Sequence, residues 1–151
     1  MELILGKAVE ADSELLTEIS KRAFHSDVCC GTGSEGGPPG YDSEEWQRKV
    51  IAGMPYYKVL YEGEVVGGVI AVDNGDGHYY LLRMFVEPDY QARGIGLKSV
   101  RLLFELYPEA KKWTLDTPAW NTRTRPFYGK LGFRIVGETE EGLLLFEKRM
   151  D

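Results

Sequence analysis

The feature that most constrains the fold is an unbroken order of strand, glycine-containing turn, helix and second strand over residues 78–117. The first strand reads HYYLLRMFV, the helix runs from Ile95 to Tyr107 before Pro108, and the second strand reads KWTLDT. One face of the helix carries Gly96, Val100, Leu103 and Tyr107. Because a helix connects the two strands, the order predicts a right-handed parallel crossover.

Most of the remaining chain reads as antiparallel strands joined by tight turns. The segments YYKVLY and VVGGVIAV are separated by EGE, and NGDG precedes the strand that begins at residue 78. A first strand covers Leu3 to Val9, and a terminal hairpin turns near Glu141 and Gly142. We therefore predict a mixed α/β (α+β) fold: a mostly antiparallel sheet of six to seven strands around the parallel unit, about four helices, and one domain over residues 1–151.

Three further helices are predicted around this sheet. The first, with Asp12 as its cap, carries apolar residues at four-residue spacing: Leu15, Ile19 and Ala23. The second begins at Asp42, where Asp42 and Glu45 form a capping-box pattern. A short helix covers Thr124 to Leu131. Residues 26–41, rich in glycine and holding two prolines, are predicted to be a loop.

Composition narrows the class of protein. The 151 residues are 43% hydrophobic and carry a formal net charge of −6 without a basic run, which favours a soluble globular domain and disfavours nucleic acid as a partner. Cys29 and Cys30 are adjacent, so neither a disulfide framework nor a metal site is expected. Neither a leader pattern nor an apolar run that could span a membrane is present, so we expect a cytoplasmic protein.

The segment QARGIG, Gln91 to Gly96, lies between the long strand and its helix. Gly94 and Gly96 let a ligand approach the backbone, and the first helical N–H groups form an anion site that the helix dipole strengthens. A pyrophosphate fits such a site, and a purely structural tight turn fits the same glycines. No Gly-Lys-Ser/Thr triplet follows, and Ser99 occupies the third position of the dinucleotide fingerprint, which disfavours kinase and dehydrogenase functions.

Two motifs carry a resemblance to a known family. VEPDYQARGIGLKSVRLLFE resembles the acyl-CoA-binding segment of the GCN5-related N-acetyltransferase (GNAT) superfamily, whose Gln/Arg-x-x-Gly-x-Gly/Ala signature is filled by Gln91, Arg93, Gly94 and Gly96. LDTPAWNTRTRPFYGKLGF resembles the later strand, asparagine, short helix and Tyr-x-x-x-Gly-Phe ending, carried by Asn121, Tyr128, Gly132 and Phe133. The resemblance, strongest over residues 80–133, implies an N-acetyltransferase that uses acetyl-CoA.

The resemblance also implies a path for coenzyme A. Backbone N–H groups would hold the pyrophosphate, namely those of Gln91, Ala92, Arg93, Gly94, Ile95, Gly96 and Leu97, and Arg93 would add a charge. In the family the fourth strand carries a bulge and splays from the fifth, and pantetheine pairs with the strand in that gap. Here the pairing would fall near Met84, Phe85 and Val86. A strand N–H there would stabilise the developing oxyanion.

Asn121 and Tyr128 each admit two roles. The family's tyrosine at this position acts as a general acid on the departing thiolate, and an aromatic residue beside a strand also commonly packs in a core. Asn121 would bond the pantetheine amide, and its side chain also suits a helix cap. We therefore assign Tyr128 as the catalytic residue and treat both residues as coenzyme-binding.

The resemblance leaves the general base open. Members with a catalytic glutamate on the fourth strand place it about where Tyr80 stands, so this chain lacks that carboxylate. Asp116, near the open end of the fifth strand, and His25, beside the loop, are the candidates, together with a water relay. Glu87 and His78 are expected to face solvent.

The acceptor amine is not identified from the sequence. The family builds its amine pocket partly from the loop between the first two helices, so residues 26–41 are either a mobile lid with Tyr41 and Trp46 near its hinge or an ordinary surface loop. An acidic group there favours a cationic acceptor: Asp27, Glu35, Asp42, Glu44 and Glu45. Acidic helix starts also have a structural reason of their own.

One rival from another class is a non-catalytic acyl-CoA-binding or sensor domain. Such a domain would keep QARGIG without needing Tyr128 or an acceptor pocket, so the presence of Tyr128 and Asn121 favours the enzyme. Homodimers are common in the family, so the resemblance admits a homodimer as well. Nucleic acids and membranes are not expected partners.

Overall fold

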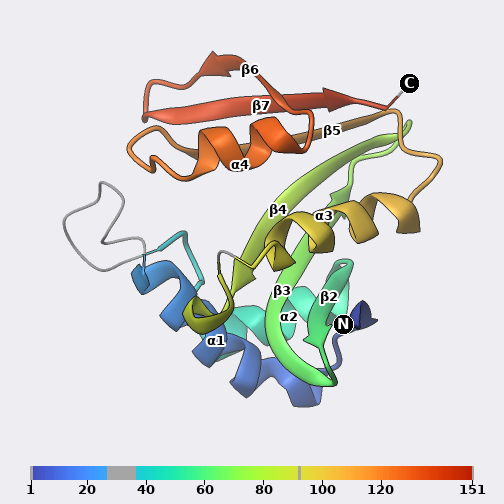
Figure 1. The fold of residues 1–151 in the computed structure, drawn as a ribbon, viewed down its shortest axis with the longest axis vertical. Coiled ribbons are helices and arrows are strands. Elements are labelled where there is room, and N and C mark those ends of the chain that lie inside the picture. Colours follow the sequence, from blue (N-terminus) through green and yellow to red (C-terminus); the bar gives the residue numbers. More distant parts are fainter. Residues whose placement is uncertain (1, 27–36, 92, 151) are drawn as a thin grey trace.

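A computed structural model describes residues 2–26, 37–91 and 93–150. Within them, seven strands form one sheet in the order β1-β2-β3-β4-β5-β7-β6 (Figure 1). The strands are β1 (Leu3–Lys7), β2 (Tyr56–Tyr61), β3 (Glu64–Asp73), β4 (His78–Val86), β5 (Lys112–Pro118), β6 (Arg134–Glu138) and β7 (Leu143–Arg149). Neighbouring strands pair antiparallel except β4 and β5, which pair parallel. The predicted mixed sheet with its central parallel unit is confirmed.

Four α-helices cover the two faces of the sheet in the described part of the chain. They are α1 (Ser13–His25), α2 (Glu44–Gly53), α3 (Ile95–Leu106) and α4 (Thr124–Lys130). Leu16 of α1 and Val50 of α2 share a buried cluster with Ile70 of β3 on one face. On the other face, Leu103 of α3 shares a buried cluster with Trp113 of β5. Figure 1 shows α3 and α4 on the same side of the sheet, opposite α1 and α2.

The predicted cap of α2 is wrong, and Asp12 occupies the predicted N-cap position of α1 without a side-chain capping bond. α2 begins at Glu44 because the hydroxyl of Ser43, rather than the Asp42 side chain, accepts the Trp46 N–H at 3.1 Å. The carboxylate of Asp12 accepts the Val9 N–H at 2.8 Å and makes no side-chain cap bond to α1. Other boundaries move by one or two residues, with β1 ending at Lys7, α3 at Leu106 and α4 at Lys130.

Leu103 anchors α3 on the sheet. Its side chain is fully buried in the larger of the two clusters, beside Trp113. Leu103→Ala is expected to lower the free energy of unfolding by about 2–5 kcal/mol, because it removes transfer free energy and leaves a cavity. Urea denaturation measures this loss.

Leu106 provides the matched control on the same helix, since it is 48% exposed. Leu106→Ala is expected to cost less than about 1 kcal/mol. Equal losses for the two variants would contradict the orientation of α3.

Candidate active site

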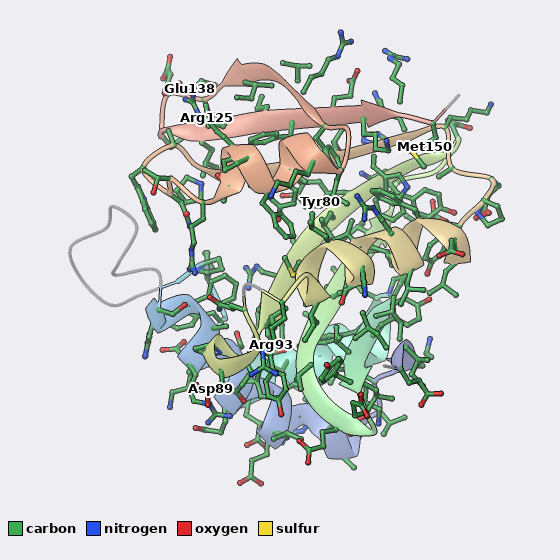
Figure 2. The ribbon with its side chains drawn as sticks, in the orientation of Figure 1. Tyr80, Asp89, Arg93, Arg125, Glu138 and Met150 are labelled. Atoms are coloured by element: carbon green, nitrogen blue, oxygen red, sulfur yellow. The ribbon has the colours of Figure 1, made fainter. Side chains whose placement is uncertain are left out.

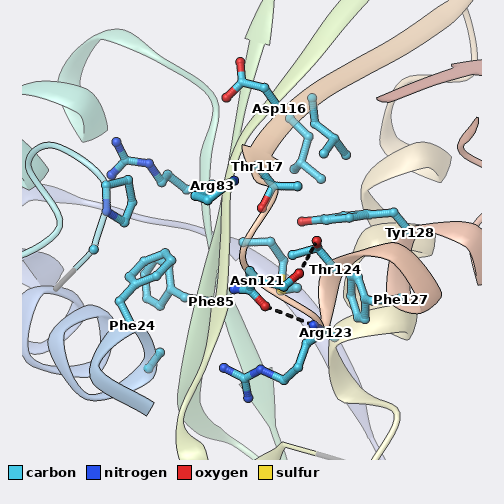
Figure 3. A pocket seen from close by; sticks show the side chains of 18 of the residues that line it. Phe24, Arg83, Phe85, Asp116, Thr117, Asn121, Arg123, Thr124, Phe127 and Tyr128 are labelled. Atoms are coloured by element: carbon cyan, nitrogen blue, oxygen red, sulfur yellow. Dashed lines mark hydrogen bonds between the residues drawn. The ribbon is translucent and has the colours of Figure 1, made fainter. Parts of the chain in front are cut away.

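The parallel strands β4 and β5 separate soon after they meet. Among the described residues, they pair only where His78–Tyr80 lies beside Lys112–Thr114. Beyond that point a cleft of about 1100 Å³ opens between them, lined by both strands, the start of α3, and α4 with the turn before it. Figure 3 shows side chains of both strands and of α4 converging on this space. The predicted splay is therefore present.

A β-bulge in β4 changes the face of the sheet to which the following side chains point. Two neighbours in β3 pair with residues of β4 that are not neighbours, Ile70 with Arg83 and Ala71 with Leu81. Leu82 is therefore an extra residue, and side chains after it change face. Arg83 is turned toward α2 rather than α3, since its guanidinium lies over the Trp46 ring, 4.6 Å from the ring centroid.

The glycine turn lies at the N-terminus of α3, at one end of the cleft. Gly94 is the N-cap with a φ of +78°, a conformation that L side chains rarely adopt. The N–H groups of Ile95, Gly96 and Leu97 precede the first i→i−4 bond of this helix, from the Lys98 N–H to the Gly94 carbonyl at 3.1 Å. Such N–H groups at a helix start favour an anion.

Most of the predicted coenzyme residues line the cleft. They are Met84, Phe85, Val86, Gln91, Gly96, Leu97, Asn121 and Tyr128. Gly94 and Ile95 are not among the described residues that line the cleft, and the side chain of Ile95, the first residue of α3, is buried. The guanidinium of Arg93, marked in Figure 2, lies 5.0 Å from the Tyr90 ring centroid and does not line the cleft. Ala92 lies outside the described residues.

Gln91 uses its side chain to hold the turn in place. Its amide nitrogen donates to the Val86 carbonyl at 2.9 Å, and its amide oxygen accepts from Nη1 of Arg123 at 2.7 Å. Arg123 lies in the turn before α4 and brings a guanidinium to the same end of the cleft (Figure 3). Arg123 was not predicted from the sequence, because no local pattern signals a contact across 32 residues.

Asn121 and Tyr128 lie on the α4 side of the cleft (Figure 3). Oδ1 of Asn121 accepts the Arg123 backbone N–H at 3.0 Å within the turn before α4, whose N-cap is Arg123, so Asn121 holds this turn and does not cap the helix. The Tyr128 ring packs edge-on against Phe127 and Phe133, with centroid distances of 4.9 and 5.7 Å. Its hydroxyl is directed into the cleft. The ring of Tyr128 is thus a packed aromatic, while its hydroxyl is placed to meet a ligand.

The strands on the other side of the cleft bring together a tyrosine and a carboxylate. The Tyr80 hydroxyl donates to Oδ2 of Asp116 at 2.7 Å, at the point where Tyr80 is the last residue of β4 that pairs with β5. Burial, and then this hydrogen bond, raise the pKa of Tyr80 above its ordinary value, so its hydroxyl stays protonated at neutral pH. Asp116 is exposed to the cleft that it lines. A carboxylate from β5 therefore lies beside the β4 position where the resemblance placed a glutamate.

His25 is not brought to the cleft. Its Nε2 lies 2.9 Å from the Tyr41 hydroxyl, and it is not among the described residues that line the cleft. Asp116 is therefore the base candidate that the geometry favours.

Glu87 and His78, expected to face solvent, are engaged with the protein. Glu87 accepts two hydrogen bonds from Arg22 of α1, at 2.6 and 2.8 Å. Nε2 of His78 lies 2.9 Å from Oγ1 of Thr114. Both side chains are partly exposed, so the expectation holds only in part, because each side chain also contacts a residue far along the chain, in α1 or β5.

Several predictions fall partly outside the described residues. The cysteine pair and two of the acidic loop residues, Asp27 and Glu35, lie within residues 27–36, and so does most of the predicted loop. In the part of the chain that is described, no group of three or more His, Cys, Asp or Glu side chains could hold a metal ion. No described helix has the length and apolar character needed to cross a bilayer.

A splayed parallel strand pair with a helix N-terminus at one end defines an α/β domain suited to an extended, anionic ligand. The sequence matches the Acetyltransferase (GNAT) family over residues 15–133. The chain therefore belongs to the GNAT family of acetyltransferases, as the resemblance predicted.

Individual relatives agree with this assignment. The chain is 31% identical over 138 residues to YrkN of Bacillus subtilis, described as uncharacterized, covering 89% of this chain and 75% of that protein. It is also 31% identical over 99 residues to a spermine/spermidine N(1)-acetyltransferase of Bacillus subtilis, covering 56% of this chain and 64% of that protein. Its fold is similar to that of PaiA N-acetyltransferase from Thermoplasma acidophilum, solved with coenzyme A, with a TM-score of 0.85 at 18% identity, covering 99% of this chain and 100% of that one.

Proposed function

We propose that this chain, as one domain over residues 1–151, transfers the acetyl group of acetyl-CoA to a primary amine of a small molecule or peptide. The observation that carries the proposal is the cleft between β4 and β5, with the α3 N-terminus at one end and Tyr128 and Asp116 along its walls. The chain's membership of an acetyltransferase family supports the proposal, and so does its similarity in fold to PaiA, which was solved with coenzyme A.

Acetyl-CoA would lie along the cleft. The N–H groups at the start of α3 would bind the pyrophosphate, and Arg123, beside Gln91, would add a charge-assisted contact. The pantetheine arm would follow the unpaired edge of β4 near Met84–Val86 and place the acetyl group where the strands part. A β4 N–H aimed at the acetyl oxygen would stabilise the developing oxyanion.

The ammonium group of the acceptor first gives a proton to the base. The neutral nitrogen then attacks the acetyl carbon, a C–N bond forms, and the C–S bond breaks. The thiolate takes a proton from the Tyr128 hydroxyl, and the second proton lost by the nitrogen returns to the Tyr128 oxygen. Because a thiol has a pKa of about 8.5 and an amine one of about 10, the thiolate leaves readily and the acid contributes modestly.

Asp116 is the proposed base, held by the Tyr80 hydroxyl. Both residues belong to the face of the sheet on which α1 and α2 pack, since Tyr79, Leu81 and Leu115 beside them pack in the cluster of the opposite face. The acceptor would therefore enter from the α1 and α2 side, while coenzyme A binds at the α3 end. A water relay through Asp116 gives the same proton balance.

Asp116→Asn is expected to lower kcat/KM for the amine about tenfold at neutral pH. The deficit should shrink as pH rises toward the amine's own pKa, because more of the amine is then neutral without help from a base. A pH profile of thiol release measures both effects.

Asp76→Asn is the matched control, since Asp76 lies in the turn between β3 and β4 with a φ of 55° that asparagine tolerates. Its pH profile should equal that of the parent. A deficit in Asp116→Asn that is constant at all pH values would contradict the base role.

Product analysis tests the proposed function itself. The protein, acetyl-CoA carrying a labelled acetyl group, and a broad amine panel are incubated, and mass spectrometry follows the label into an amide. Label in an acetylated amine supports the proposal. Binding of acetyl-CoA without label transfer to any amine would instead favour a non-catalytic sensor, and the proposal would fail.

A homodimer and a cytoplasmic location stay predictions. Light scattering of the purified protein tests the first, and fractionation of cells that express the chain tests the second.

A further inference from the structure

Arg83 is the cationic side chain on the acceptor face of the cleft. The bulge at Leu82 turns it away from α3, and it lines the cleft together with Tyr80 and Asp116. Figure 3 marks Arg83 and Asp116. The Arg83 guanidinium lies over the Trp46 ring of α2. A guanidinium in contact with an aromatic face can still donate hydrogen bonds from its N–H groups.

The charge of Arg83 is only partly compensated by the protein. Its one hydrogen bond among the described residues is from Nη2 to the Pro39 carbonyl, at 2.7 Å, although a guanidinium has five N–H donors. None of the described carboxylates forms an ion pair with it. Burial lowers the pKa of Arg83 from its ordinary value, and Tyr80, Tyr56 and then Asp116 offset this only in part. A desolvated cation with spare donors is suited to binding an oxyanion.

The charges of the cleft favour the same kind of ligand. In the described part of the lining, three charged side chains are cationic and one is anionic: Arg83, Arg123, Lys130 and Asp116. Arg123 lies at the coenzyme end, beside Gln91, whereas Arg83 and Asp116 share the acceptor face.

The described acidic residues once expected to attract a cationic acceptor are placed elsewhere. Glu44 pairs with Arg48 and Glu45 with Lys49, both along the exposed side of α2. Neither these glutamates nor Asp42 lines the cleft. They therefore give no support to a polycationic acceptor.

We propose that the acceptor carries a carboxylate as well as its amine, with the carboxylate bound by Arg83 and the amine held near Asp116. The inference rests on the proposed acetyl transfer and specifies the substrate class of the same cleft. An amino carboxylate complements this pair of opposite charges, whereas a polyamine would place a second cation against Arg83.

Matched acceptors test the proposal by thiol release from acetyl-CoA. Glycine, β-alanine and lysine are each compared with their own carboxamides, and spermidine serves as a polycation. The carboxylate member of at least one pair should have the higher kcat/KM. Arg83→Gln should lower the ratio of kcat/KM for carboxylate over carboxamide by about tenfold to a hundredfold, through KM. Arg83→Lys should restore only part of the ratio, since it lacks the bidentate fork.

Arg48→Gln is the matched control, because Arg48 is a cation on the exposed side of α2. It should leave the ratio unchanged. Acetyl-CoA affinity measured on every variant shows whether Arg83→Gln retains the folded cleft. This proposal fails if carboxamides or spermidine are turned over in preference to carboxylates. It also fails if Arg83→Gln lowers kcat/KM equally for both members of a pair. Acetyl transfer stands in either case. Thiol release with none of the amines would remove acetyl transfer, and this inference with it.

Discussion

Gly94→Val is expected to weaken acetyl-CoA binding by about a hundredfold or more, measured by titration calorimetry. Gly94 has a φ of +78°, which a β-branched residue adopts only with strain, so the turn must change its conformation. A changed turn would misdirect the N–H groups at the start of α3. Hydrogen bonds to charged groups contribute about 1.5–3 kcal/mol each, and losing two of them exceeds the ~2.7 kcal/mol that a hundredfold change requires.

Gly63→Val separates backbone strain from ligand binding. Gly63 has a φ of +83° in the turn between β2 and β3, and a Cβ added there would meet nothing within 4 Å, as at Gly94. Gly63→Val should therefore lose similar stability and keep its affinity for acetyl-CoA. Full affinity in a folded Gly94→Val variant would contradict the phosphate site.

Gly96→Val is a less selective test of the same turn. A Cβ at Gly96 would lie 3.0 Å from the Phe127 ring and 3.4 Å from the Met84 side chain. Valine there would push α4 away from α3. A loss of acetyl-CoA affinity could then come from disturbed packing as well as from a lost contact with the ligand. The sequence treats the two glycines alike, but the structure gives them different neighbours.

Tyr128→Phe is expected to lower kcat roughly tenfold to a thousandfold with little change in acetyl-CoA affinity. Phenylalanine keeps the ring contacts with Phe127 and Phe133, so the fold of α4 is retained. What is lost is the hydroxyl that reaches the cleft and would protonate the departing thiolate. Steady-state kinetics at saturating acetyl-CoA measures kcat, and calorimetry measures the affinity.

Tyr107→Phe removes a hydroxyl of the same kind outside the cleft. The Tyr107 hydroxyl lies 2.7 Å from that of Tyr57, on the edge of the buried cluster beneath α3. Its loss should cost about 1 kcal/mol of stability and leave kcat unchanged. If kcat were unchanged in Tyr128→Phe as well, the acid role of Tyr128 would be excluded.

Most of the fold could be predicted from local sequence patterns. Hairpin turns such as NGDG and the strand-to-helix order over residues 78–117 specify which strands pair, and these pairs make up much of the observed sheet. Helix caps were less predictable: Asp42 and Ser43 both suit an N-cap, and the backbone geometry selects Ser43. The glycine turn was predictable because its function depends on backbone conformation, which short motifs specify.

The side-chain part of the site was harder to predict, because it depends on contacts between distant residues. Tyr80 meets Asp116 only because β4 and β5 are neighbours in the sheet. Arg83 faces the acceptor side only because the bulge at Leu82 breaks the alternation of β4. A strict period of two from Leu81 would place it beneath α3. Neither the contact of Tyr80 with Asp116 nor the orientation of Arg83 can be predicted from a local sequence pattern.

The central claim is that the cleft between β4 and β5 binds acetyl-CoA for transfer to an amine. Titration calorimetry with acetyl-CoA, followed on the same preparation by thiol release across an amine panel, tests it most directly. We expect saturable binding at one site, lost in Gly94→Val and kept in Tyr128→Phe, with thiol release for at least one amine. Absence of binding by the folded protein would contradict the account.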